Sequence, residues 1–317
     1  MISALIFSMN RVENVVKLSE KIKGYVDEIV IIDSSDKEKF EEMKNRIPYA
    51  RIYWLPPLGM ADFYYKIGLE LCKNEWILHL DDDEEPSDEL LKDLKLLIGS
   101  DHKVYSIWRI SKSSKMCQRI FRLFHKNYIV PSGVIHLTWF SKVKPVLLDR
   151  KYHIVHYEED VKIEKIKNYA IIDSWQFCCK ICFLILETEY YTLSKLLNSI
   201  RKIGKIISYK SKLGKFGWFL LSIEFNIFIS LYRVKLYFKN FKYLFYYSIL
   251  YSIFFQIYLL KDFSKKLEAS LKMWEIGVFE FLGLDSYENA LKTLEGLDSK
   301  NGLENFVRLV KIRLRNF

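Results

Sequence analysis

The chain has 317 residues, of which 50% are hydrophobic and 16% aromatic, and its formal net charge is +10. This composition excludes intrinsically disordered, collagen-like and low-complexity chains, and the length allows one large domain or two of ordinary size. The spacing of the five cysteines fits neither a disulfide framework nor a zinc site. Residues 1–9 lack the basic segment of a signal peptide, so a cytoplasmic protein is expected.

Charge is distributed unevenly along the chain. Residues 1–100 contain 13 Lys or Arg against 20 Asp or Glu, a net charge of −7, whereas residues 101–260 contain 26 against 10, a net charge of +16. An acidic first third is suited to cation binding. A basic middle third is suited to polyanions such as nucleotide phosphates, nucleic acid or an anionic membrane. For any single lysine, an ordinary solvated surface position is the simpler interpretation.

Strand and helix patterns alternate along the first hundred residues. The predicted strands are 2–8, 28–33, 50–55 and 75–80, and the predicted helices are 12–24 and 61–72. This alternation predicts a parallel sheet flanked by helices. Two of the strands lead into a carboxylate, Asp33 and Asp81, and ligands bind at the carboxyl edge of such sheets.

After Pro86 the chain continues with a helix and then with strands. Ser87 is a suitable N-cap for a helix whose apolar face is formed by leucines between residues 90 and 97. Further strands are predicted at 103–110, 118–125 and 147–157, and from about residue 163 the pattern becomes helical and rich in aromatic residues. We therefore expect one domain at 1–170 and a helical region at 171–317, the last part of which, from about residue 263, is predicted to form three helices.

Five consecutive carboxylates, from Asp81 to Glu85, follow the hydrophobic strand at 75–80. Carboxylates this close repel one another, so at neutral pH they need a cation or raised pKa values. Oxygen ligands favour Mg²⁺ or Mn²⁺, which keep coordination positions for phosphate oxygens. An acidic turn before a capped helix would also explain the run. Its position after a buried strand, together with Asp33, favours a metal-assisted site for a nucleoside diphosphate.

Several segments resemble glycosyltransferase family 2, whose members have the GT-A fold. The resemblance begins with residues 2–10, with DEIVIIDS at 27–34 and with EWILHLDDDE at 75–84. It continues with RIFR at 119–122, GVIH at 133–136, and His156 followed by Lys167-x-Tyr169-Ala170, which are similar to lipopolysaccharide core enzymes of the WaaE type. It covers residues 1 to about 175, and its order and spacing are more specific than any one segment.

The resemblance implies a GT-A, Rossmann-like and mostly parallel α/β sheet flanked by helices, followed by a mostly α-helical C-terminal region. It implies inverting transfer of a sugar from a nucleoside-diphosphate sugar to a hydroxyl of a glycan or lipid-linked, polyprenol-type acceptor, assisted by Mn²⁺ or Mg²⁺. The site residues that it implies are Asp33 for the base, Asp81 for the ribose or metal, Asp83 and His156 for the metal at the diphosphate, Arg119 and Arg122 for the leaving group, and His136 on the catalytic side.

The sequence departs from this family pattern at two positions that matter for mechanism. Leu137 stands where the family usually has Glu, and Arg11 replaces the Glu that normally follows the first-strand Asn. The catalytic base is therefore open. The candidates are Glu158, which we favour, and Glu159, Asp160 and Glu84. Either another carboxylate has taken over, or catalysis is weakened and the protein acts as a subunit or scaffold.

The second half of the chain suggests contact with a membrane surface. Residues 195–215 are basic and amphipathic, and residues 243–260 form an uncharged run of 18 residues. As a helix this run would be roughly 27 Å long against a hydrocarbon core of ~30 Å, and its scattered tyrosines favour an interfacial or buried helix over a membrane span. We expect peripheral association with the cytoplasmic face of the membrane, although a helix packed on its own domain is an equal alternative.

A nucleic-acid-binding protein is the rival from another functional class. The +16 middle segment would provide the charge, but no helix-turn-helix, RNA-recognition or zinc motif accompanies it. The sequence therefore favours a metal-dependent glycosyltransferase and predicts no nucleic-acid partner.

Overall fold

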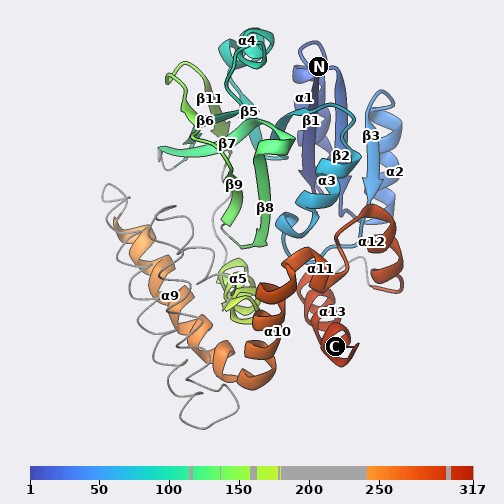
Figure 1. Ribbon diagram of the computed structural model, residues 1–317, viewed down its shortest axis with the longest axis vertical. Coiled ribbons are helices and arrows are strands. Elements are labelled where there is room, and N and C mark those ends of the chain that lie inside the picture. Colours follow the sequence, from blue (N-terminus) through green and yellow to red (C-terminus); the bar gives the residue numbers. More distant parts are fainter. Residues whose placement is uncertain are drawn as a thin grey trace. The chain divides into compact units, whose positions relative to one another are not determined.

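The computed structural model describes residues 1–113, 117–135, 137–157, 163–177, 179, 241–297 and 301–316. The chain forms two compact units (Figure 1). The first consists of residues 1–133, 138–160 and 283–306, and the second of residues 134–137, 161–282 and 307–317.

A nine-stranded sheet is the centre of the first unit. Its strands are β1 (Ile2–Ser8), β2 (Glu28–Asp33), β3 (Arg51–Trp54), β4 (Trp76–Asp81), β5 (Glu84–Pro86), β6 (Val104–Ser111), β7 (Cys117–His125), β10 (Val146–Leu147) and β11 (His153–His156). They follow the order β3-β2-β1-β4-β7-β6-β11-β5, with β10 added to β6. The pairs β1–β2, β1–β4, β2–β3, β6–β10 and β6–β11 are parallel, whereas β7 and β5 pair antiparallel with their neighbours.

Parallel pairing brings the ends of three strands to one edge of this sheet. Ser8 of β1 is in register with Asp33 of β2, and Phe7 of β1 is in register with Asp81 of β4. The two strand-end carboxylates therefore lie on either side of β1. The predicted α/β architecture, with a mostly parallel sheet flanked by helices, is confirmed.

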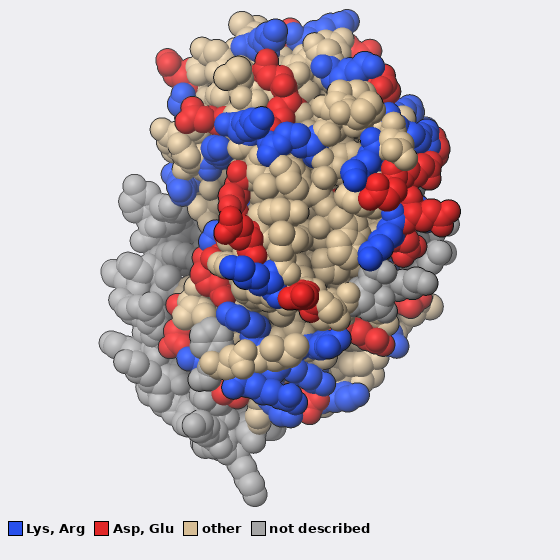
Figure 2. Space-filling view, turned by 90° about the vertical axis from the view of Figure 1, so that its right-hand side faces the viewer, with Lys and Arg blue, Asp and Glu red and all other residues tan. Residues whose placement is uncertain are grey.

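The helices that flank the sheet bury apolar faces against it. They are α1 (Val12–Ile22), α2 (Lys37–Arg46), the 3₁₀ turn η1 (Ala61–Tyr64) with α3 (Tyr65–Leu71), and α4 (Asp88–Ile98). Val15 of α1 and Leu94 of α4 are fully buried in one core cluster with Ile6 and Leu78 of the sheet. Ser87 accepts the Leu90 N–H at 3.2 Å, as expected of an N-cap. Figure 2 shows Lys and Arg side chains interspersed with Asp and Glu on the face that it presents. Helix α2 carries an exposed ion pair between Lys44 and Glu41.

Residues 283–306 belong to the first unit although they lie far away in sequence. Helix α12 (Tyr287–Thr293) brings Tyr287 against Tyr53, with ring centroids 5.2 Å apart. Asn305 donates a hydrogen bond to the Pro57 carbonyl at 2.9 Å. The contacts thus group residues 283–306 with the sheet. The sequence analysis placed the same residues in the helical region at 171–317.

The second unit is helical in its described part. Its helices are α5 (Ile163–Trp175), α9 (Phe241–Leu260), α10 (Phe263–Ile276) and α11 (Val278–Leu282), and the last helix, α13 (Gly302–Asn316), extends into it. Tyr251, Phe255 and Leu259 of α9 are buried in a cluster with α5 and α10. Among the described residues, no helix combines the length and hydropathy needed to cross a bilayer. The helical C-terminal region is confirmed.

Some predicted element boundaries are wrong for local reasons. The strand expected at 147–157 is broken into β10 and β11, because Asp149 accepts the Lys151 N–H in an Asx turn. Residues 61–72 begin as a 3₁₀ turn. From residue 263 the described chain forms four helices where three were expected, because Gly277, at φ 98°, ends α10. A two-stranded sheet of β8 (Ile129–Val134) and β9 (Leu137–Ser141), with the short turn η2 (Lys126–Tyr128) before it, has no counterpart in the predictions.

Candidate functional site

The segment after β1 connects the two loops that follow the strand-end carboxylates Asp33 and Asp81. Asn10 adopts a left-handed conformation, with φ 62°, that turns the chain from β1 into α1, and asparagine tolerates this conformation better than most residues. The Met9 N–H donates to the Asp82 carboxylate at 3.2 Å, and the Asn10 N–H donates to the Ser35 hydroxyl at 2.7 Å. The loop that follows β2 and the turn that follows β4 are therefore held by the same short piece of backbone.

Asp33 is fully buried at the end of β2. Its carboxylate accepts the Ser35 hydroxyl at 2.6 Å and the Ser35 N–H at 3.2 Å. Burial raises the pKa of Asp33 to about 6, although the hydrogen bonds from Ser35 act in the opposite direction. The side chain thus stiffens the loop after β2 and is not among the groups that line the cavity described below.

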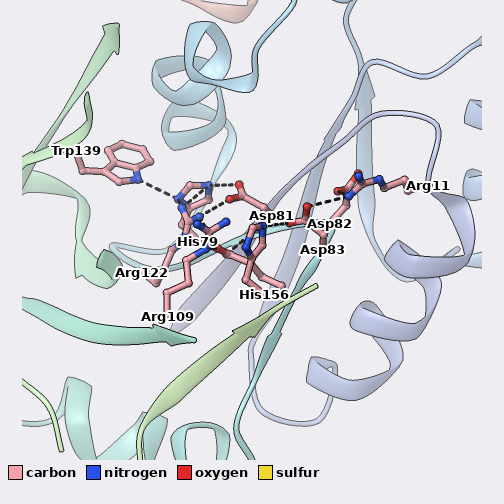
Figure 3. Close-up of polar contacts among 10 residues, drawn as sticks. Arg11, His79, Asp81, Asp82, Asp83, Arg109, Arg122, Trp139 and His156 are labelled. Carbon is pink, nitrogen blue, oxygen red and sulfur yellow. Dashed lines mark hydrogen bonds and ion pairs between the residues drawn. The ribbon is translucent and has the colours of Figure 1, made fainter. Parts of the chain in front are cut away.

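The acidic run itself folds into a tight turn. Asp81 ends β4, Glu84 begins β5, and the Asp81 N–H donates to the Glu84 carboxylate at 3.0 Å. Asp82 and Asp83 occupy the tip of the turn. The Tyr157 N–H donates to the Asp83 carbonyl at 2.8 Å, which attaches the turn to the end of β11. The first four carboxylates of the run, Asp81 to Glu84, separate into two groups that have different cationic partners (Figure 3).

The first group, which we call the Arg122 cluster, contains His79, Asp81, Glu84, Arg109 and Arg122. Arg122 forms ion pairs with Asp81 and, at 2.8 Å, with Glu84. Arg109 forms a second ion pair with Glu84 at 2.7 Å. Burial alone would raise the pKa of Asp81, but Arg122, His79 and Arg109 together outweigh it and hold that pKa well below its usual range. Asp81 is therefore ionised at neutral pH.

A β-bulge directs Arg122 into this cluster. In the pairing of β6 with β7, Tyr105 is opposite Leu123 and Ser106 is opposite Phe121, so Arg122 is the extra residue. Its side chain is only 5% exposed. Bulges re-aim side chains beside functional sites, and here the extra residue supplies the cation that two neighbouring carboxylates share.

The second group, the Arg11 cluster, contains Arg11, Asp82, Asp83 and His156. The Arg11 Nη1 atom lies 3.0 Å from an Asp82 oxygen and 2.9 Å from an Asp83 oxygen. His156, at the end of β11, places its Nε2 atom 3.4 Å from the other Asp83 oxygen. Burial raises the pKa of Asp82 to about 7 even though Arg11 lowers it. Burial would raise the pKa of Asp83, but the hydrogen bonds and charge of His156 and Arg11 together lower it.

A cavity of about 150 Å³ opens beside the Arg11 cluster. The residues that line it come from α1, from the acidic turn and from the end of β11; they are Asn14, Lys17, Leu18, Lys21, Asp82, Asp83, Glu84, Glu85 and Tyr157. Lys21 forms an ion pair with Glu85 at 2.7 Å, so the rim carries both charge signs. The cavity gives a ligand access to the tip of the acidic turn.

The chemistry of Asp83 and His156 fits a divalent cation. A carboxylate oxygen and an imidazole nitrogen face each other at 3.4 Å, and Mg²⁺ or Mn²⁺ in phosphate sites takes only one or two protein ligands beside phosphate oxygens and water. Within the ranges that the structure describes, no group of three or more His, Cys, Asp or Glu side chains forms a fuller metal set. Asp81 fits less well, because one of its oxygens is already paired with Arg122.

The remaining residues from the sequence analysis divide into two sets. Arg119 lies over the Trp108 ring at 4.3 Å, and in the described part of the chain no contact connects it with either cluster. His136 and Glu158 lie outside the described residues, as do Glu159 and Asp160, so their roles stay predictions.

Several residues of the site were missed as site residues. The sequence contained a signal for His79 as a site residue: it precedes Asp81 by two positions on a strand, so the two side chains point to the same face of the sheet. The sequence contained no such signal for Arg109 and Trp139, because each contacts a residue that lies far away in the sequence. Trp139 donates its indole N–H to His79 at 2.9 Å. Arg11 was noticed only as a departure from the family pattern.

Comparisons with known proteins relate part of the chain to glycosyltransferases. No family model matches. The chain is 30% identical over 101 residues to an uncharacterised glycosyltransferase of Rickettsia felis, which covers 31% of this chain and 34% of that protein. It is 29% identical over 104 residues to one from Rickettsia bellii, and 22% identical over 190 residues to one from Rickettsia prowazekii, covering 53% of this chain and 64% of the relative. The chain thus spans about a third of the length of the first two relatives.

Solved structures give a weaker likeness. The S. aureus TarS structure matches 55% of this chain and 39% of TarS at 13% identity, with a TM-score of 0.34. A TarS structure of residues 1–349 matches 86% of this chain and 91% of that one at 11% identity, with a TM-score of 0.39. TM-scores this low carry no argument about the fold or the function of this chain. The relationship to glycosyltransferases is supported by the sequence matches alone.

Proposed function

We propose that this protein is an inverting glycosyltransferase that moves a sugar from a nucleoside-diphosphate sugar to a hydroxyl of an acceptor. The observation that carries the proposal is the acidic turn after β4, whose Asp82 and Asp83 face a cavity beside Arg11 and His156. The similarity to uncharacterised glycosyltransferases supports the class of reaction.

The two strand ends would receive the nucleoside. We propose that the nucleobase of the donor binds at the loop after β2, which Asp33 holds in place. The ribose would bind at Asp81, one of whose carboxylate oxygens is fixed by Arg122. Asp81 is ionised and partly exposed, and an ionised carboxylate is a strong acceptor for ribose hydroxyls. Its role is therefore to orient the donor.

Asp83 and His156 would hold Mn²⁺ or Mg²⁺ at the diphosphate. When bound, such an ion neutralises the charge that develops on the leaving nucleoside diphosphate. Arg11 and Lys17 come from the start of α1 and from the cavity rim, and they would attract the same phosphates. We give this role to Arg11 in preference to Arg119, which stacks on Trp108.

The catalytic base is assigned to the acidic segment that follows β11. Tyr157 lines the cavity and its N–H is bound to the Asp83 carbonyl, and Glu158 comes next in the chain. A carboxylate there would take the proton from the acceptor hydroxyl as that oxygen attacks the anomeric carbon and the diphosphate departs. His136 stays a second candidate on the acceptor side.

The acceptor is proposed to be a glycan or a lipid-linked glycan at a membrane surface. Helix α9 exposes Ile249, Ile253, Ile257 and Leu260, each 42–57% accessible, along one side. Their spacing forms an apolar stripe, which supports peripheral binding. Flotation with vesicles that contain anionic lipid tests this part: the protein should float with the vesicles, and recovery of all the protein in the unbound fraction would contradict it.

The reaction is tested with a panel of nucleotide sugars and Mn²⁺. We expect slow release of nucleoside diphosphate from one donor, because water can replace the acceptor, and loss of this release when EDTA removes the metal. Binding of a nucleoside diphosphate without any turnover of its sugars would favour the weakened family member that acts as a subunit. No binding and no turnover would contradict the proposal.

A further inference from the structure

A buried hydrogen-bonded chain leads from β9 to Asp81. His79 is fully buried on β4, and its ring contacts Trp139, Arg122 and Asp81 (Figure 3). The Trp139 indole N–H donates to His79 Nδ1 at 2.9 Å, and Arg122 Nη1 lies 2.5 Å from the same atom, nearer than to Nε2, from which it is 3.3 Å away. His79 Nε2 lies 3.5 Å from an Asp81 oxygen.

These partners determine where the proton of His79 lies. Indole nitrogen and guanidinium are donors without acceptor capacity, so Nδ1 must be the acceptor for both. The ring proton is then on Nε2, which faces the Asp81 carboxylate. His79 therefore converts two donors on one side of its ring into a donor directed at Asp81.

Trp139 is held firmly enough to set the position of the ring. Its indole stacks on the Tyr65 ring, with centroids 4.6 Å apart and an interplanar angle of 8°, and the Phe124 ring lies 5.0 Å away. Tyr65 and the Phe7 ring also contact the His79 ring from the side. Close packing on both aromatic partners leaves the indole N–H little freedom to point elsewhere.

We propose that Trp139 and His79 are positioning residues for the donor, because they fix the Asp81 carboxylate in the orientation that binds the nucleoside. The effect on donor binding rests on the proposed function, whereas the hydrogen-bonded contacts of Trp139, His79 and Asp81 do not depend on it. Arg122 holds one Asp81 oxygen and His79 faces the other, so the carboxylate cannot rotate to satisfy only one of them.

The geometry is tested by NMR of the histidine rings in the full-length protein. Long-range proton–nitrogen spectra distinguish a ring protonated at Nε2 from one protonated at Nδ1, and the His79 signals are assigned by their loss in His79→Gln. We expect the Nε2 tautomer in the wild type. A ring protonated at Nδ1, or at both nitrogens at neutral pH, would overturn the proposed chain.

The consequence is tested with Trp139→Phe, which keeps a stacked ring and removes the indole N–H. We expect the KM for the nucleotide sugar, and the Kd for uridine or guanosine diphosphate, to rise about tenfold, while kcat changes less than about threefold. Trp76→Phe is the control: Trp76 is buried on β4, the strand that carries His79, and its indole N–H has no partner among the described residues. The control should keep the wild-type KM.

The outcomes separate this inference from the proposed function. Equal KM and Kd values in Trp139→Phe and Trp76→Phe would overturn the positioning role. A parallel fall of kcat and melting temperature in Trp139→Phe, with KM unchanged, would likewise overturn it and leave a structural role. If the wild type shows the Nε2 tautomer yet neither binds a nucleoside diphosphate nor turns over a nucleotide sugar, the proposed function fails while the hydrogen-bonded chain stands.

Discussion

The Arg122 cluster and the Arg11 cluster share one acidic turn but are built differently. In the Arg122 cluster, His79, Glu84 and Arg122 are almost completely buried, and the guanidinium comes from a bulged strand in the middle of the sheet. In the Arg11 cluster, Arg11 precedes a helix and lies beside a cavity, and its side chain is 23% exposed. Adjacent carboxylates thus have different surroundings because successive residues of the turn face different elements.

This difference indicates a division of work within the site. Buried charges that are paired and hydrogen-bonded hold a geometry, and removing one partner leaves the other uncompensated. Partly exposed charges beside a cavity, such as the side chains of Arg11, Asp82 and Asp83 at 13–23% exposure, can exchange a protein partner for a ligand at smaller cost. We therefore propose that the Arg122 cluster is the support and that the Arg11 cluster contacts the diphosphate.

The largest expected effect comes from removing the buried cation. In Arg122→Met, the carboxylates of Asp81 and Glu84 lose the buried cation that they share, and among the described residues only Glu84 keeps a second arginine partner, Arg109, so we expect the free energy of unfolding to fall by about 3–5 kcal/mol. Urea-induced unfolding of the wild type and the variant measures this difference in the free energy of unfolding. A loss below ~1 kcal/mol would mean that the two clusters do not differ in the way described.

A smaller effect concerns pH and the buried Asp33. Its pKa in the folded protein is about 6, above the ordinary 3.8, because of burial. Between these two values the native state keeps a proton that the unfolded state has lost, so this group makes stability fall as pH rises from about 4 through 6. Its contribution is roughly 3 kcal/mol at most.

The variant Asp33→Asn isolates that contribution. It lacks the titrating group and keeps a side chain that can hydrogen-bond Ser35, so its free energy of unfolding should decline less than that of the wild type between pH 4 and 7. Parallel pH profiles for the two proteins would show that Asp33 titrates with an ordinary pKa.

The smallest effect on stability is expected at Arg11. Because Arg11 and its two carboxylates are partly exposed, Arg11→Met should cost less than about 1 kcal/mol of unfolding free energy. The same variant should weaken nucleoside diphosphate binding about tenfold, measured by calorimetry, since a phosphate-facing cation is lost. Strong destabilisation with unchanged binding would reverse the roles of the two clusters.

Much of the fold could be predicted because its signals are local. The strands at 2–8 and 28–33 were predicted with the boundaries that the structure shows, since continuous apolar, β-branched runs mark buried parallel strands. Ser87 was identifiable as an N-cap from its own neighbours. The edge of the sheet that carries Asp33 and Asp81 followed from the alternation of strands and helices.

The site was less predictable because its contacts join distant residues. Arg11 and Asp82 are separated by 71 positions, and nothing near either residue signals the other. The position of Arg122 depends on a one-residue shift between β6 and β7, which only the pairing of the strands reveals. Arg119 and Arg122 looked equivalent in the sequence, and the bulge is what separates them.

The central claim is that Asp83, with His156, forms a metal-dependent site for the diphosphate of a nucleotide sugar. Titration calorimetry of uridine and guanosine diphosphate with wild type and Asp83→Asn, each with Mn²⁺ and with EDTA, tests it most directly. The account predicts that EDTA weakens binding to the wild type at least about tenfold, and that Asp83→Asn binds equally weakly in both conditions. Equal affinity in wild type and variant, with and without Mn²⁺, would contradict it.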